Sequence, residues 1–121
     1  MLNSDLKAAE ARLRGLCLAL PETDEKLSHG MPAFRVAGKM FAYLWHDHHM
    51  DGLTRVAVKT TGRDEQDFLI EAAPETYSWL PYMGPSGWVG VSLADDADWA
   101  LIEARVGSSW RLAAPRRLAV G

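Results

Sequence analysis

The sequence contains little cysteine and no long apolar run. Among its 121 residues Cys17 is the only cysteine, so no disulfide can form within the chain. Disulfide-rich secreted scaffolds are thereby excluded. Cys17 lies in a leucine-rich helical run, where a buried and unreactive thiol is expected. No stretch approaches the length of about 18 apolar residues typical of a membrane span, and no secretory signal pattern opens the chain. We therefore expect a cytoplasmic protein without a membrane segment.

The chain also lacks an excess of positive charge. Its net charge is −3, so the whole molecule repels nucleic acid unless its cations gather on one face. Hydrophobic residues make up 48% and charged residues 24%, which is an ordinary globular balance. No linker or repeat divides the sequence. We expect one domain over residues 1–121.

Periodicity and turn residues predict the order of the elements. A helix is expected over residues 5–20, because apolar residues recur at helical spacing until Pro21. Thr61 is expected to cap a second helix that ends before Pro74, and Asp95 or Asp96 is expected to cap a third. Strands are expected over residues 26–30, 33–36, 39–45, 53–59, 77–82 and 88–93.

The connections between these elements are short. Ala37-Gly38 is suited to a tight hairpin, with Gly38 at positive φ. Short connections favour antiparallel pairing. The predicted fold class is α+β, with an antiparallel sheet, helices packed on it, and the order helix, three to four strands, helix, two strands, helix.

The segment His29-Gly30-Met31-Pro32-Ala33-Phe34-Arg35-Val36-Ala37-Gly38-Lys39-Met40-Phe41-Ala42 resembles the most recognisable stretch of the MmcQ/YjbR-like family. The similarity continues through residues 56–59, the acidic helix after them, and residues 87–91. The matching positions are Pro32, Phe34, Arg35, Gly38, Lys39, Phe41, Lys59, Gly87 and Trp88.

This resemblance implies an α+β fold similar to that of type III secretion chaperones. Members of the family are described as predicted DNA-binding proteins with a double-wing motif, and no catalytic residues come with the resemblance. This chain has Ser86 where many members carry a basic residue, which removes one positive charge from the implied DNA-binding face.

Four cations are the candidate nucleic-acid-binding residues. Arg35, Arg55 and Lys59 have the strand parity opposite to the apolar positions, so they should share the non-core face of the sheet, with Lys39 at the hairpin base. Such a surface would bind an anion. The alternative is an ordinary solvated sheet face, on which basic residues discourage association between sheet edges.

The chain has five tryptophans, and some of its aromatic residues fall near one turn. Trp79, Tyr82 and Trp88 flank the turn at residues 84–87 and are a candidate platform for a base or a peptide. Packing within the sheet explains the same residues equally well.

The sequence contains little that indicates a catalytic site or a metal site. His46, His48 and His49 form a polar cluster, but their spacing matches no known zinc pattern. Ser28-His29 is a pair of sequence neighbours, and adjacency does not make a catalytic set. We expect no metal and no cofactor.

Three classes of function follow in order. The first is a non-enzymatic binding protein that contacts an anionic partner such as DNA weakly and without sequence preference, through Arg35, Lys39, Arg55 and Lys59. The second is a protein- or peptide-interaction module, chaperone-like or homodimeric, that uses a sheet face or edge. The third is a small-molecule or metal-dependent enzyme.

Overall fold

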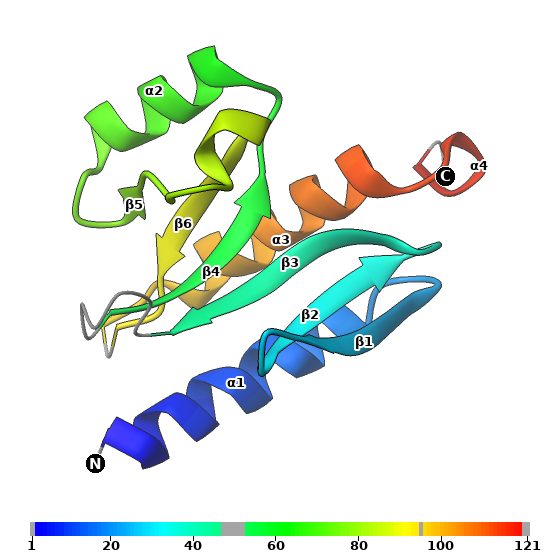
Figure 1. The fold of residues 1–121 in the computed structure, drawn as a ribbon, viewed down its shortest axis with the longest axis horizontal. Coiled ribbons are helices and arrows are strands. Elements are labelled where there is room, and N and C mark those ends of the chain that lie inside the picture. Colours follow the sequence, from blue (N-terminus) through cyan, green and yellow to red (C-terminus); the bar gives the residue numbers. More distant parts are fainter. Residues whose placement is uncertain (1, 47–52, 95, 120–121) are drawn as a thin grey trace.

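The computed structural model describes residues 2–46, 53–94 and 96–119. The helices are α1 (Leu2–Leu18), α2 (Arg63–Ala72), the short 3₁₀ helix η2 (Gly84–Ser86), α3 (Trp99–Ala113) and α4 (Arg116–Ala119). The strands are β1 (Thr23–Ser28), β2 (Met31–Val36), β3 (Lys39–His46), β4 (Thr54–Lys59), β5 (Tyr77–Ser78) and β6 (Trp88–Ser92). All six strands form one antiparallel sheet in the order β1-β2-β3-β4-β6-β5 (Figure 1). The predicted α+β class is confirmed.

One face of the sheet is covered by α1 and α3, which lie behind the strands in Figure 1. Alternate residues of the central strands point into this helix-covered core, where their side chains are fully buried. They include Phe34, Val36, Leu44, Val56, Val58, Val89 and Val91. Leu13 and Cys17 from α1 and Ile102 and Val106 from α3 complete the packing. The main hydrophobic core therefore lies between the sheet and these two helices.

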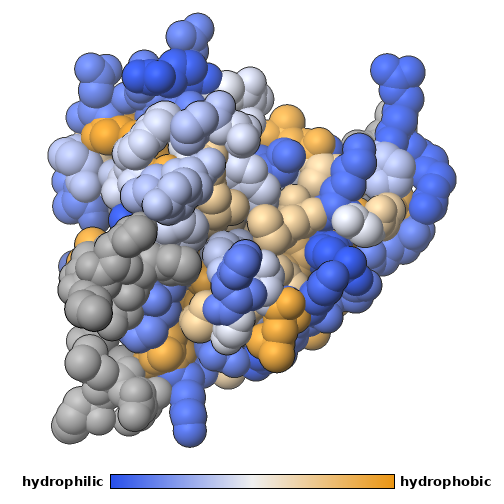
Figure 2. Space-filling model, viewed as in Figure 1, coloured by the Kyte–Doolittle hydropathy of each residue, from blue (hydrophilic) through white to orange (hydrophobic). Residues whose placement is uncertain are grey.

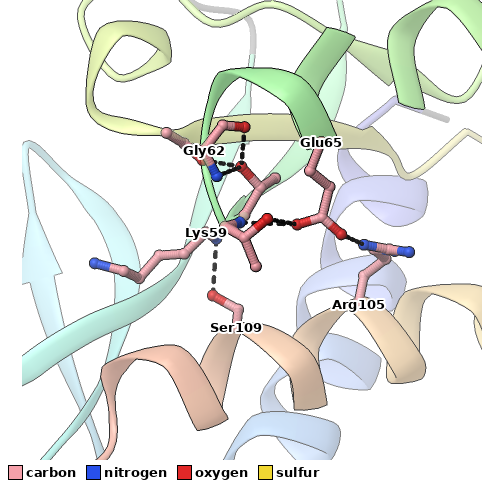
Figure 3. A network of polar contacts seen from close by, with 8 residues as sticks. Lys59, Gly62, Glu65, Arg105 and Ser109 are labelled. Atoms are coloured by element: carbon pink, nitrogen blue, oxygen red, sulfur yellow. Dashed lines mark hydrogen bonds and ion pairs between the residues drawn. The ribbon is translucent and has the colours of Figure 1, made fainter. Parts of the chain in front are cut away.

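A buried hydroxyl from α3 separates two central strands. Pairing between β3 and β4 ends at Ala42 and Val58, so Phe41 and Lys59 would be the next pair in that register. Instead, the Ser109 hydroxyl donates to the Phe41 carbonyl. It accepts from the Lys59 amide, 2.8 Å away (Figure 3). Ser109 thus satisfies both backbone groups. Beyond this point β3 and β4 diverge, as Figure 1 shows.

Strand β4 stays with β6 after it leaves β3. Lys59 pairs with Trp88, and the next amide, that of Thr60, donates to the Gly87 carbonyl at 2.9 Å. The Thr60 hydroxyl donates to the same oxygen at 2.7 Å. The sheet consequently has two halves, β1-β2-β3 and β4-β6-β5, which open from a shared end.

The predicted helices differ from the observed ones mainly at their ends. The first helix spans residues 2–18 rather than 5–20. The third was predicted to begin after Asp95 or Asp96, but the cap is Asp98, whose side chain accepts from Ala100 and Leu101. The second spans Arg63–Ala72. Its cap is Gly62, with φ 147°, rather than the predicted Thr61, whose amide donates to Glu65. The short α4 was not predicted.

The predicted strand over residues 77–82 is wrong beyond Ser78. Only Tyr77 and Ser78 pair with β6. Pro81 has no amide to donate, and Tyr82 has φ 69°, so the chain turns away from the sheet into η2. The hairpin at Ala37-Gly38 is confirmed, with positive φ at both residues, the pattern of a type I′ turn.

None of the described helices combines the length and the apolar composition needed to cross a membrane.

We predict that Ser109→Ala destabilises the fold by about 2–4 kcal/mol, because it leaves the Phe41 carbonyl and the Lys59 amide buried without this partner. Urea unfolding measures the change. Ser108→Ala is the matched control on the exposed side of α3, and its effect should stay within about 0.5 kcal/mol. Equal effects of the two substitutions would contradict the bridging role of Ser109.

Burial raises the pKa of the Cys17 thiol to about 12. An unfolded chain ionises its thiol near its ordinary pKa of about 8.5, so the stability contributed by the neutral thiol is complete below that pH and is lost as pH rises towards 12. We expect the stability difference between the native protein and Cys17→Ala to shrink by about 2 kcal/mol between pH 8.5 and 10, measured by urea unfolding. Comparison with Cys17→Ala removes the contributions of other titrating groups. Rapid alkylation of Cys17 by iodoacetamide in the folded protein would overturn this account.

Candidate binding surface

The sheet face turned away from α1 and α3, here called the outer face, carries a second hydrophobic cluster. Its buried members are Ala33, Tyr43, Trp45, Ala57, Leu80 and Trp88. The register places Ala33, Tyr43 and Ala57 side by side across β2, β3 and β4. Tyr43 and Trp45 meet edge to face with ring centroids 6.2 Å apart. The outer face was predicted to be a non-core face, and this cluster corrects that prediction.

Methionine side chains border the outer-face cluster. Met31, Met40 and Met83 are the methionines within the described part of the chain, and all three pack against the cluster while staying partly exposed. Figure 2 shows a pale orange, hollowed area over β2 and β3, between the side formed by α2 and η2 and the side formed by β1. Methionine is flexible and polarisable, so it adapts to partners of different shape.

The side of the hollow formed by α2 and η2 is held by a buried amide. Gln66 of α2 is 2% exposed, and its Nε2 donates to the carbonyls of Gly84 at 2.7 Å and Trp88 at 2.8 Å. This amide joins α2, η2 and the start of β6. No pattern in the sequence marks Gln66, because a glutamine in an acidic helix is typical of an exposed position.

Arg35 lies on the outer face, as its parity predicts, but its charge is compensated. Its guanidinium holds Asp24 through two hydrogen bonds, of 2.9 and 3.0 Å, across the β1–β2 pair. This hydrogen-bonded pair lowers the pKa of Asp24 and raises that of Arg35. Arg35 therefore offers little uncompensated charge to an anion.

Arg55 also lies on the outer face but is only 8% exposed. Its Nη1 donates to the Ser78 hydroxyl at 3.1 Å. A Cβ atom added at Gly90 would come within 3.1 Å of the Arg55 Cδ and 2.9 Å of Leu80, so glycine allows both side chains to lie over β6. Arg55 is thus part of the packing between β4 and β5.

Lys59 and Lys39 occupy different sides of the sheet. The Lys59 ammonium lies 5.5 Å from the centre of the Trp88 ring, a cation–π contact at the outer face. Lys39 pairs with Val36, whose side chain lies in the helix-covered core, so alternation separates Lys39 from Arg35. The four predicted cations therefore do not form one exposed surface.

The three predicted platform aromatics have different surroundings. Trp88 is 7% exposed within the outer-face cluster, whereas Trp79 is 41% exposed and lies under the Arg63 guanidinium, 5.3 Å from its ring centre. Tyr82 is 82% exposed. Trp79 lines a groove of about 290 Å³ with Gly62, Gln66 and the turn at residues 84–87.

A larger cleft of about 340 Å³ opens where β3, β4 and β6 meet the segment that leads into β5. His46, Thr54, Arg55, Ser78 and Ser92 contribute its polar atoms, and Leu6 and Leu93 are among its apolar ones. His46 Nδ1 lies 2.7 Å from the Thr54 hydroxyl. His48 and His49 lie outside the described residues. Within the described ranges no three His, Cys, Asp or Glu side chains gather as metal ligands.

We predict that Gly84→Ala destabilises the protein by about 1–3 kcal/mol, because the added methyl group would overlap the Trp79 indole. Gly107→Ala in α3 is the control, since no atom lies within 4 Å of its added Cβ, and it should gain up to about 1 kcal/mol of helix stability. Thermal unfolding compares the two variants. A neutral Gly84→Ala would show that the Trp79 ring is not held against η2.

Comparison with known proteins agrees with this fold. No curated protein sequence matches the chain. The crystal structure of Deinococcus radiodurans protein DR2400, which carries the family-model domain DUF419, superposes with a TM-score of 0.67 at 23% identity and covers 83% of this chain and 74% of that one. At that identity the likeness concerns the fold alone. The model of the YjbR family matches residues 18–112, and the chain therefore belongs to the YjbR family, as the resemblance of its His29–Ala42 segment predicted.

Proposed function

We propose that this protein is a non-enzymatic binding module of the cytoplasm that holds a segment of another polypeptide on the outer face of its sheet. The observation that carries the proposal is the outer-face cluster bordered by Met31, Met40 and Met83. A sheet face with no binding role is usually polar. On this face Ala33, Tyr43 and Trp45 are buried, and the apolar surface within reach of a partner is that of the three methionines, which are partly exposed.

The shape of this surface suits an extended chain. The two halves of the sheet diverge beyond Ala42 and Val58, and the hollow lies over the strands on one side of that divergence. Three methionine side chains at its border can adjust to apolar side chains of different size. Backbone groups of β2 and β3 are already paired with neighbouring strands, so binding here depends on side chains.

The charges favour a polypeptide over DNA as the partner. Ion pairs hold Arg14, Arg35, Arg63, Arg105 and Arg117 to carboxylates of the same chain. Duplex binding depends on many lysines and arginines that contact phosphates. DNA binding through Arg35, Lys39, Arg55 and Lys59 is the competing proposal, and the experiment below separates the two.

We predict that fluorescein-labelled, reduced and carboxymethylated α-lactalbumin, a permanently unfolded chain, binds saturably in an anisotropy titration. Met31→Ser combined with Met40→Ser should weaken this binding by about tenfold or more, because about 2 kcal/mol of apolar contact is lost. Leu112→Ser is the control, since Leu112 is an exposed apolar residue on α3, away from the outer face.

Three results would count against the proposal. Equal binding by the methionine variant and the control would remove the outer face from the interaction. Saturable binding of a labelled random duplex that weakens with salt, combined with no binding of the unfolded chain, would replace the polypeptide with DNA. A dimer that dissociates on Met31→Ser with Met40→Ser, seen by sedimentation without any ligand, would make a second copy of this chain the partner.

A further inference from the structure

The outer face carries positive charge on a protein that is negative overall. Strand alternation places the charged side chains Asp24, Lys26, Arg35, Arg55 and Lys59 on this face. Four of the five are cations, although the whole chain has a net charge of −3. Asp24 is the one carboxylate among these five, and it is already bound to Arg35. The asymmetry is therefore local to the proposed binding surface.

Two lysines supply the charge that a partner can reach. Arg35 is neutralised by Asp24, and Arg55 is enclosed beside Ser78 and Gly90. Within the described part of the chain, no carboxylate oxygen lies within 4 Å of the ammonium of Lys26 or Lys59. Lys26 is exposed on β1, and Lys59 is partly exposed on β4 above Trp88.

The lysines stand on opposite sides of the apolar hollow. Lys26 is in register with Ala33, Tyr43 and Ala57, in turn, across β2, β3 and β4. Lys59 lies two residues further along β4. Three strand spacings separate the two strands, so the lysine Cα atoms are at least about 14 Å apart.

We infer that the segment bound on the outer face is acidic as well as apolar, with two carboxylates that flank its apolar residues. This inference rests on the proposed function and names the chemistry of its partner. In an extended segment, which rises about 3.3 Å per residue, carboxylates four to six residues apart would reach Lys26 and Lys59 together. The apolar side chains between them would then contact the partly exposed Met31 and Met40.

A phosphate backbone satisfies only half of this surface. Its charges would meet the lysines, but the partly exposed methionines of the outer face would stay in contact with charged or hydrated groups. An acidic and apolar polypeptide satisfies both features, which is why it is the occupant favoured here.

Three labelled peptides of 12 residues test the inference. All share the same apolar residues; one has Asp at positions 4 and 9, the second has Asn at both, and the third has Asp at positions 4 and 5. We expect the first to bind about tenfold more tightly than the second at low salt, and the third to bind between them. The advantage should fall as ionic strength rises.

Variants of the lysines test whether Lys26 and Lys59 cause the tighter binding of the Asp peptide. Lys26→Gln combined with Lys59→Gln should remove the difference between the Asp and Asn peptides and leave binding of the Asn peptide unchanged. Lys39→Gln, which removes a lysine placed opposite the core residue Val36, should preserve the difference. If the double variant unfolds, Lys26→Gln alone should still reduce the tenfold preference for the Asp peptide to about threefold, because Lys26 lies exposed on the edge strand β1.

The outcomes separate this inference from the proposed function. Equal binding of the Asp and Asn peptides would overturn the acidic partner and keep the polypeptide-binding module. Binding of neither peptide, together with no binding of unfolded α-lactalbumin, would overturn both. A labelled 20-nucleotide single strand that displaces the Asp peptide and loses binding in the double lysine variant would assign the surface to nucleic acid instead.

Discussion

The Ser109 hydroxyl sets the shape of the sheet. It replaces the backbone pairing that would join Phe41 to Lys59, so β3 and β4 separate at this point. β3 stays paired with β2, and β4 stays paired with β6. β4 follows β6 through Thr60 and Gly87, and the second half of the sheet turns away from the first. The hollow on the outer face lies beside this separation (Figure 2), and Lys59 stays beside Trp88 because β4 remains paired with β6.

A network of polar contacts holds the first turn of α2, just after the end of β4. Glu65 accepts from the Thr61 amide and holds Arg105 of α3 at 3.2 Å, as Figure 3 shows. These donors lower the pKa of Glu65. Because α3 supplies both Ser109 and Arg105, this helix contacts both the point where β4 separates from β3 and the first turn of α2. Gln66, the residue after Glu65, then reaches the Gly84 and Trp88 carbonyls that support the side of the hollow.

Much of this architecture could be predicted from the sequence, because it depends on local patterns. Alternation in Phe34–Val36 and Thr54–Lys59 assigned Arg35, Arg55 and Lys59 to the face that they occupy. Pro21 and Gly38 marked a helix end and a turn. What alternation cannot reveal is whether a face is covered. The outer face is buried in part because Leu80 folds back over Gly90, a contact between residues that no short-range pattern connects.

The charge of each face depends on strand register. Glu25 and Lys26 are consecutive on β1, and they point to opposite sides of the sheet. Glu25 meets Arg14 of α1 through hydrogen bonds of 2.7 and 2.8 Å, which lower its pKa and anchor α1 to the edge strand. Lys26 is left on the outer face. A slip of one residue would bring the lysine towards Arg14 and the carboxylate to the outer face, so the ion pair that anchors α1 also keeps the outer face positive.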